Sequence, residues 1–166
     1  MPSFEIHDEL FVPLPRDEVF PFFADARNLE AITPGFLGFK ILTPSPIVMQ
    51  TGALIDYSLK LHGVPIKWRT RIAAWAPPRM FVDEQLRGPY SLWQHEHTFE
   101  EVEGGTLVAD HVTYEHFGGG LVNRWLVAPD LEKIFAHRKQ RTYELLTGLP
   151  FVAEEQEARP GALSAG

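Results

Sequence analysis

The feature that most restricts the fold is a series of segments between residues 53 and 116 in which apolar and polar side chains alternate. In residues 66–75, for example, Trp68 lies on one face, while Lys67 and Arg69 lie on the other. Because successive side chains of a strand point to opposite faces, each segment predicts a strand with one buried and one wet face. Turns rich in Gly and Pro separate the segments, which is typical of an antiparallel sheet. The predicted strands cover residues 4–12, 39–42, 53–61, 66–75, 80–86, 90–102 and 106–116.

Helical segments are predicted after the first strand and at the end of the domain. A short apolar helix directly follows the first strand, and a second helical segment covers residues 25–32. Residues 121–146 carry an apolar side chain every three to four positions, which predicts a long amphipathic helix with a bend at Pro129. We therefore expect one α+β domain over residues 1–148. Residues 149–166 are rich in Glu, Ala and Gly and are predicted to form a disordered tail.

Composition argues against several classes of function. The net charge of −7 argues against binding nucleic acid through its phosphates, which requires clustered Lys and Arg. The chain has no cysteine, which excludes disulfides, thiolate metal sites and a cysteine nucleophile. The sequence shows no signal peptide and no stretch close to the ~20 apolar residues of a membrane-spanning helix. We expect a cytoplasmic protein without an integral membrane segment, and its oligomeric state stays open.

The most informative stretch is residues 93–99, Trp-Gln-His-Glu-His-Thr-Phe. On a strand, the period of two places His95 and His97 on one face together with Trp93 and Phe99. The side chains of the opposite face are polar and suit contact with water. Both imidazoles are therefore predicted to point into the protein.

A hairpin that closes at Glu103-Gly104 gives the buried imidazoles an acidic partner. With these two residues as the turn, His97 lies directly opposite Asp110 on the next strand. Side chains at such facing positions have Cβ atoms ~5 Å apart, within reach of a hydrogen bond. A bulged turn would shift the register by one residue and leave the two side chains diagonal.

Three interpretations of the His97–Asp110 pair stay open at this stage. In the first, the pair is structural, because a buried carboxylate is costly unless it is paired. In the second, its polar atoms orient a bound ligand. In the third, His95 or His97, held by Asp110, is a catalytic acid or base. The sequence leaves open whether the protein is an enzyme.

A metal centre is the less favoured alternative for the same residues. The His-x-His pattern together with Asp110 offers three ligands. His111 and Glu115 are predicted to point outward, so no fourth ligand is evident. We therefore expect neither a metal ion nor another cofactor.

Other inward-facing side chains are candidates for contact with a ligand. Arg138 lies near the inner stripe of the long helix, where it would reach the rim, pair with Asp83 or Asp110, or bind an anionic group. Aromatic residues on the same faces are shared between core and pocket. The full set of predicted ligand contacts is Tyr57, Trp68, Thr70, Phe81, Asp83, Gln85, Trp93, His95, His97, Val112, Tyr114, Leu121, Trp125, Phe135 and Arg138.

Two segments carry a resemblance to a known superfamily. Residues 14–34, which begin Leu-Pro-Arg-Asp-Glu-Val-Phe, resemble the start of bacterial members of the SRPBCC, or START-like, superfamily. Residues 88–99, Gly-Pro-Tyr-Ser-Leu-Trp-Gln-His-Glu-His-Thr-Phe, followed by Asp110 and Tyr114, resemble a bacterial subgroup with a Trp-x-His-x-His-x-Phe motif. This subgroup is similar to the polyketide cyclase/dehydrase and lipid-transport group.

The resemblance implies a helix-grip fold, in which about seven antiparallel strands curve around a long C-terminal helix, with two short helices after the first strand. It also implies a cavity that binds or transports a small hydrophobic ligand such as a lipid, a polyketide or an isoprenoid-like molecule. The alternative is a cyclase or dehydratase, a lyase or isomerase, that uses His97–Asp110 or His95 for proton transfer. A protein-interaction module with a solid interior is the third and weakest hypothesis. The fold alone does not choose among these functions.

Overall fold

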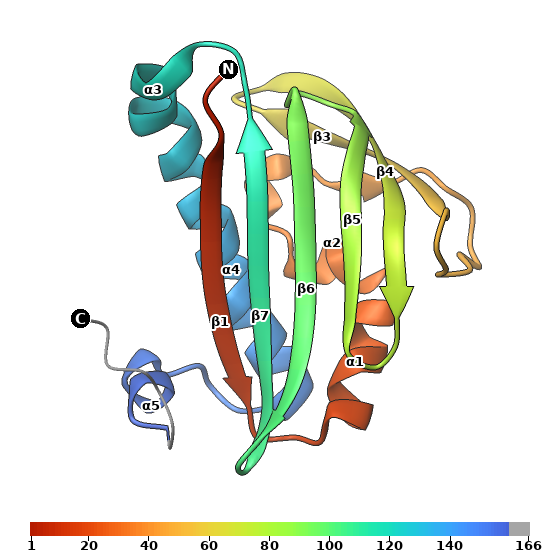
Figure 1. Cartoon of the computed structure of the whole chain (residues 1–166), viewed down its shortest axis with the longest axis vertical. Coiled ribbons are helices and arrows are strands. Elements are labelled where there is room, and N and C mark those ends of the chain that lie inside the picture. The colour runs from red at the N-terminus through yellow and green to blue at the C-terminus, as the bar shows by residue number, and fades with distance from the viewer. Residues whose placement is uncertain (160–166) are drawn as a thin grey trace.

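The computed structural model describes residues 1–159 and contains one antiparallel sheet of seven strands (Figure 1). The strand order across the sheet is β1-β7-β6-β5-β4-β3-β2, so each neighbouring pair except β1 and β7 is also consecutive in the chain. The strands are β1 (Phe4–Val12), β2 (Lys40–Ile41), β3 (Leu54–Leu61), β4 (Val64–Ala76), β5 (Met80–Arg87), β6 (Leu92–Val102) and β7 (Gly105–Glu115). The alternating segments of the sequence predicted all seven strands, and the helix-grip architecture is confirmed.

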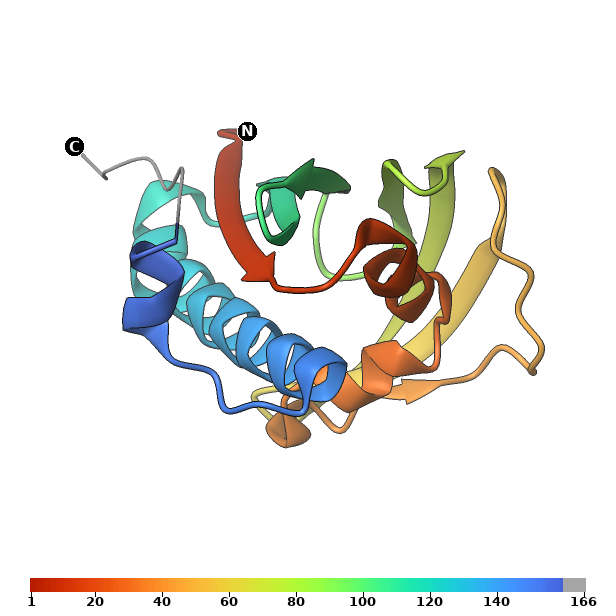
Figure 2. The same ribbon diagram turned by 90° about the horizontal axis from the view of Figure 1, so that it is seen from below.

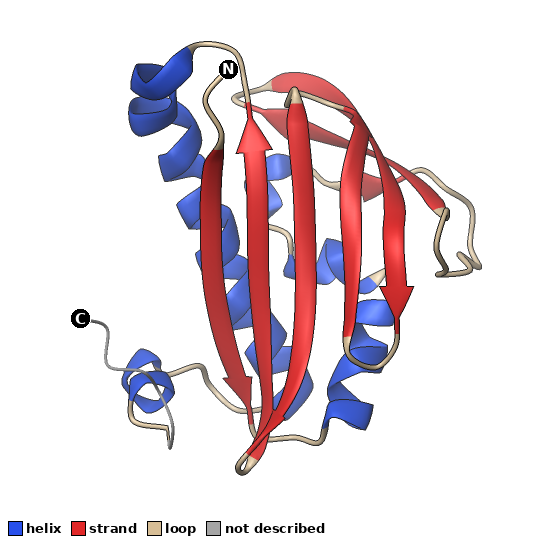
Figure 3. Ribbon diagram, in the orientation of Figure 1, coloured by secondary structure: helices blue, strands red, loops and turns tan. Residues whose placement is uncertain are grey.

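The helices lie on one face of the sheet (Figure 3). The first group, between β1 and β2, comprises α1 (Arg16–Ala24), α2 (Asn28–Ile32) and the short 3-10 helix η1 (Gly35–Leu37). The second group, after β7, comprises α3 (Gly119–Val122), η2 (Asn123–Val127) and the long α4 (Ala128–Thr147). Seen from below, α4 and the α1–α2 segment lie across the concave side of the curved sheet (Figure 2). Within residues 1–159, no helix is long and apolar enough to cross a membrane.

The core lies between the sheet and these helices and has two parts. At one end, Phe20 of α1 packs against Phe99 of β6 and Val12 of β1. At the other end, Phe135 of α4 belongs to a cluster with Trp93 of β6 and Trp68 of β4. Because most inward side chains of the strands are apolar or aromatic, their burial between the layers stabilises the sheet and α4 together.

The long C-terminal helix differs from the expected stripe in its first third. Residues of η2 form a π-helix, whose hydrogen bonds run from residue i to residue i+5. This wider turn changes the direction in which the side chains of η2 and of the preceding residues point, relative to a regular α-helix. As a result, Leu121 and Trp125 are 74% and 73% exposed, and the prediction that they face inward is wrong. Pro129 is the second residue of α4 and closely follows the π-helical residues of η2, so the irregular hydrogen bonding of this helical run lies beside the proline.

The segment after α4 is ordered over the part that the structure describes, contrary to the expected disordered tail from residue 149. Residues Ala153–Glu157 form α5 beside β1 (Figure 1). The Gln156 amide makes two hydrogen bonds to the backbone of Phe11, one in each direction, at 2.8 and 2.9 Å. These bonds satisfy backbone groups on the outer edge of β1, which has no neighbouring strand on that side. Residues 160–166 of the predicted tail lie outside the described residues.

We predict that Gln156→Ala lowers the free energy of unfolding by about 1–2 kcal/mol, because two hydrogen bonds to an edge strand are lost. Urea unfolding followed by circular dichroism measures this change. Glu155→Ala, an exposed position in the same short helix, is the matched control and should have almost no effect. Equal stability of the two variants would contradict the docking of α5 on β1.

Candidate functional site

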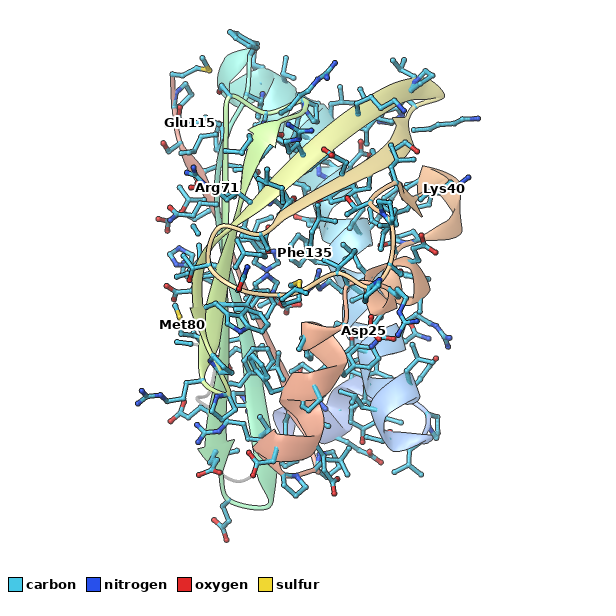
Figure 4. The ribbon with its side chains drawn as sticks, turned by 90° about the vertical axis from the view of Figure 1, so that its right-hand side faces the viewer. Asp25, Lys40, Arg71, Met80, Glu115 and Phe135 are labelled. Carbon is cyan, nitrogen blue, oxygen red and sulfur yellow. The ribbon has the colours of Figure 1, made fainter. Side chains whose placement is uncertain are left out.

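A cavity of about 190 Å³ lies between the concave face of the sheet and the helices. Its walls are mostly aromatic and aliphatic, and they come from three directions. The sheet contributes Tyr57 and Trp68, α1 contributes Phe22 and Phe23, and α4 contributes Phe135. Figure 4 shows Phe135 between the sheet and the helices. The histidines and most of the charged groups of the lining lie where β5, β6 and α4 face one another, while Asp25 lies at the end of α1.

Strand β6 brings two histidines to the cavity wall. His95 and His97 line the cavity and are only 3% and 2% exposed, as the alternation of residues 93–99 predicted. The β6–β7 hairpin has a two-residue turn, because Val102 pairs with Gly105. This register places His97 directly opposite Asp110, which confirms the predicted alignment.

The hydrogen bonds, however, cross this register. His95 Nε2 is 2.7 Å from Asp110 Oδ1, and His97 Nε2 is 2.6 Å from Asp83 Oδ2 on β5. The expected pair of His97 and Asp110 is the longer contact, at 3.4 Å between Nδ1 and Oδ1. Asp83 itself faces His95 across the β5–β6 ladder, so each carboxylate forms its shortest bond with the diagonal histidine. Diagonal neighbours on one face are within reach of side chains of this length.

Aromatic contacts hold the two imidazoles in these orientations. Their rings stack on each other with centroids 3.7 Å apart. Phe81, the direct neighbour of His97 on β5, stacks on the other side at 4.0 Å. Phe135 of α4 meets His95 edge to face at 5.6 Å. The imidazoles therefore have little freedom to rotate, and the two hydrogen bonds are fixed by packing.

The pKa values of the two histidines are shifted in opposite directions. Burial and the neighbouring charge of His97 lower the pKa of His95 to about 4. Burial also disfavours the charged form of His97, but its hydrogen bonds to Asp110 and Asp83 outweigh burial and raise its pKa above the ordinary value. Of the two imidazoles, His97 is therefore the one that is protonated first as the pH falls.

The two carboxylates remain ionised despite their burial. Burial raises the pKa of Asp83, but the hydrogen bond from His97 and nearby positive charges outweigh it, so the net pKa is lowered. The same balance, with hydrogen bonds from His95 and His97, holds the pKa of Asp110 well below its usual value. The guanidinium of Arg138 on α4 adds positive charge at the cavity wall, with Nη2 3.4 Å from His97 Nδ1. Arg138 thus contacts the imidazole rather than forming a direct pair with Asp83 or Asp110, which was one of the alternatives that the sequence left open.

Ten of the fifteen predicted ligand contacts line this cavity. Of the other five, Leu121 and Trp125 are exposed, and three are engaged elsewhere. The Gln85 amide bonds the backbone N–H and C=O of Tyr90 and fixes the β5–β6 loop. The Tyr114 hydroxyl donates to Asn123 of η2, and Val112 is fully buried in the core. The predicted residues that line the cavity are Tyr57, Trp68, Thr70, Phe81, Asp83, Trp93, His95, His97, Phe135 and Arg138.

Sequence reasoning missed the wall that the short helices provide. Phe22, Phe23 and Leu29 from the α1–α2 segment and Ile134 from α4 also line the cavity. The strongly apolar character of the first helix was a signal for burial, but it did not distinguish core from cavity. Tyr57 and Trp68, which were predicted, direct their polar atoms to the Thr70 hydroxyl at 2.8 and 3.0 Å. This part of the wall therefore has no unsatisfied side-chain donor from these rings.

A curved sheet that closes on a long helix around an aromatic cavity defines the class of helix-grip ligand-binding domains. Residues 12–141 match the family model described as polyketide cyclase / dehydrase and lipid transport. The chain belongs to this family. No curated protein sequence matches the chain.

Solved structures agree with this fold at low sequence identity. The Zhui aromatase/cyclase from a Streptomyces species is 15% identical with a TM-score of 0.69, and the match covers 98% of this chain and all of that one. A Thermus thermophilus protein is 16% identical with a TM-score of 0.70, covering 87% and 98% of the two chains. Ginseng major latex-like protein 151 is 9% identical with a TM-score of 0.65, again covering 87% and 98%. At such identities the likeness is one of fold.

We predict that the two imidazoles titrate separately in the folded protein. His95 should stay neutral until the pH falls to about 4. His97 should begin to bind its proton at a pH above 6.5, the ordinary pKa of histidine. By linkage, His97 stabilises the fold below pH 6.5, and this contribution is lost as the pH rises through its folded pKa. The pKa of His95 is lower in the folded chain than in the unfolded chain, so its protonation favours the unfolded chain. Its contribution to stability is therefore lost as the pH falls from 6.5 toward 4.

Imidazole ¹⁵N chemical shifts measured against pH distinguish the two residues directly. A short peptide with a single histidine serves as the reference for an imidazole in water. If His95 and His97 both titrated with the histidine of this peptide, the buried cluster described above would be contradicted.

Proposed function

We propose that the protein binds a small hydrophobic ligand in this cavity and holds the polar end of the ligand against the cluster of Asp83, His95, His97 and Arg138. The observation that carries the proposal is the asymmetry of the wall. Most of the lining side chains are aromatic or aliphatic, and Asp83, His95, His97 and Arg138 lie together on one side. The other charged residue of the lining, Asp25 at the end of α1, forms hydrogen bonds with Arg27. Pockets of this kind bind the apolar body of a ligand by burial and orient it through a few polar contacts.

The volume of the cavity limits the size of the ligand. An engineered apolar cavity of about 150 Å³ holds one benzene molecule. The present cavity of about 190 Å³ therefore accommodates a ring-sized molecule without any movement of the walls. A lipid, polyketide or isoprenoid-like ligand is larger, and its binding requires α4 and the α1–α2 segment to move apart.

Acid–base catalysis is the second function that a specific observation favours. His97, whose pKa is raised, and His95, whose pKa is lowered, lie side by side on the wall with their rings stacked. One imidazole is thus suited to donate a proton and its neighbour to accept one, which is the pairing that a cyclase or dehydratase requires. The matched family includes both cyclases or dehydrases and lipid-transport proteins, so the site chemistry must decide between them.

We predict that Ile134→Trp, which fills the cavity from α4, weakens benzene binding at least tenfold by isothermal titration calorimetry. Ile134 lines the cavity but is only half-buried, so the larger side chain can be accommodated without destroying the fold. Leu145→Trp, on the exposed side of the same helix, is the matched control and should bind benzene as the natural chain does. Equal affinity in all three proteins would refute binding at this cavity.

Extraction of the bound molecule from the purified protein shows whether the protein is a carrier or an enzyme. We expect solvent extraction and mass spectrometry to recover a hydrophobic molecule from the natural chain and not from Ile134→Trp. When this molecule is added back to stripped protein, a carrier returns it unchanged. An enzyme returns a product, and His97→Gln should then bind the molecule but form the product at least a hundredfold more slowly.

A further inference from the structure

The two imidazoles and two carboxylates are arranged around a common point. Asp110 Oδ1 contacts the nitrogen of each ring that faces away from β5, His95 Nε2 at 2.7 Å and His97 Nδ1 at 3.4 Å. The remaining nitrogens, His95 Nδ1 and His97 Nε2, both face Asp83 Oδ2, at 3.8 and 2.6 Å. The three ligand atoms of Asp83, His95 and His97 lie within 4.8 Å of one another.

We propose that Asp83, His95 and His97 form a binding site for a divalent first-row transition-metal ion, such as Zn²⁺ or Fe²⁺. Bonds of about 2.0–2.1 Å to nitrogen and oxygen place adjacent ligand atoms about 3 Å apart. The two distances to Asp83 Oδ2 lie on either side of that value. An imidazole nitrogen binds a metal through the lone pair in its ring plane, so bringing the three atoms around one ion also requires the stacked rings of His95 and His97 to tilt.

Asp110 has the position of an outer carboxylate in such a site. Histidine ligands of metals usually donate their second N–H to a carboxylate or carbonyl, which fixes the ring and makes the ligating nitrogen more basic. Asp110 has this hydrogen bond with His95 Nε2 at 2.7 Å, and His97 Nδ1 lies 3.4 Å from the same carboxylate oxygen. In the metal site considered from the sequence, Asp110 is the third ligand. In the structure, Asp83 of β5 is grouped with the two histidines instead.

The protein leaves open coordination positions on the cavity side. Two histidines and one carboxylate occupy three positions, and this set is typical of ions that bind a further oxygen ligand. With neutral imidazoles, the two carboxylates and Arg138 give the cluster one negative charge, which a divalent ion changes to one positive charge. An anionic oxygen at the polar end of the cavity ligand would complete both the coordination and the charge balance.

A second group of possible ligands provides the control. Glu5, His7 and His111 lie together on the outer face of the sheet, and their side chains are 57%, 66% and 40% exposed. Metal bound by the chain must therefore be assigned to one cluster or the other. The double variant His7→Asn/His111→Asn removes the surface group and leaves the buried one intact.

The test uses the full chain, stripped with a chelator, and Co²⁺ as a spectroscopic probe for the site. We expect one equivalent of Co²⁺ per chain, with equal affinity in the natural chain and the His7→Asn/His111→Asn variant. Asp83→Asn and His97→Gln should bind at least a hundredfold more weakly, and Asp110→Asn about 10–100-fold more weakly. Binding that persists in Asp83→Asn and disappears in the surface double variant would overturn the proposal.

A measurement on the natural chain covers the case in which the buried variants fail to fold. The paramagnetic ion should shift the imidazole ¹⁵N signals of His95 and His97 strongly and leave those of His7 and His111 near their original positions. If no stoichiometric Co²⁺ or Zn²⁺ is bound, or if only the surface signals shift, the metal site is refuted. Benzene binding in the stripped protein is independent of this result, so the ligand-binding proposal and the metal proposal fail separately.

Discussion

The structure depends on one constraint, which is that two imidazoles on β6 face a side of the sheet from which water is excluded. A buried polar group is costly unless it finds a hydrogen-bond partner, and a buried carboxylate is costlier still. The neighbouring strands supply both partners, Asp83 from β5 and Asp110 from β7. Any slip of one strand by a single residue would turn these groups to the opposite face. The cluster thus helps to fix the register of three central strands while it contributes the charged part of the cavity wall.

The same arrangement accounts for the difference between the two ends of the interior. Where β6 presents Phe99, the space below the sheet is filled by Phe20 of α1 and forms a solid core. Where β6 presents the histidines, a cavity remains between the sheet and α4. Phe135 and Arg138, one turn apart on α4, reach this region with an aromatic and a charged group. The ligand binding, proton transfer and metal binding proposed above all use residues at the junction of β5, β6, β7 and α4.

The sequence was sufficient for features that follow from local periodicity. Alternation along residues 93–99 and a two-residue turn at Glu103-Gly104 were enough to align His97 with Asp110. The crossed hydrogen bonds could not be derived in the same way, because a period of two determines the face of a side chain and not its torsion angles. Which carboxylate lies closer to His97 also depends on β5, whose alignment with β6 rests on a longer loop.

The remaining errors have nonlocal causes. The π-helical segment η2 looks helical by its spacing, yet it rotates Leu121 and Trp125 into solvent. The position of α1 over the cavity depends on packing between residues far apart in the chain, so Phe22 and Phe23 could not be assigned to the wall. The ordering of α5 rests on a contact between Gln156 and Phe11, at opposite ends of the domain.

The central claim is that a dry, accessible cavity lies directly against the two imidazoles, and a crystal structure under xenon pressure tests it most directly. Xenon enters apolar cavities of this size and is readily located by its electron density. The account predicts xenon between the sheet and α4, in contact with Phe135, with His95 and His97 bonded to Asp110 and Asp83. The account would be contradicted if side chains filled the space between the sheet and α4, or if the two imidazoles pointed into bulk water.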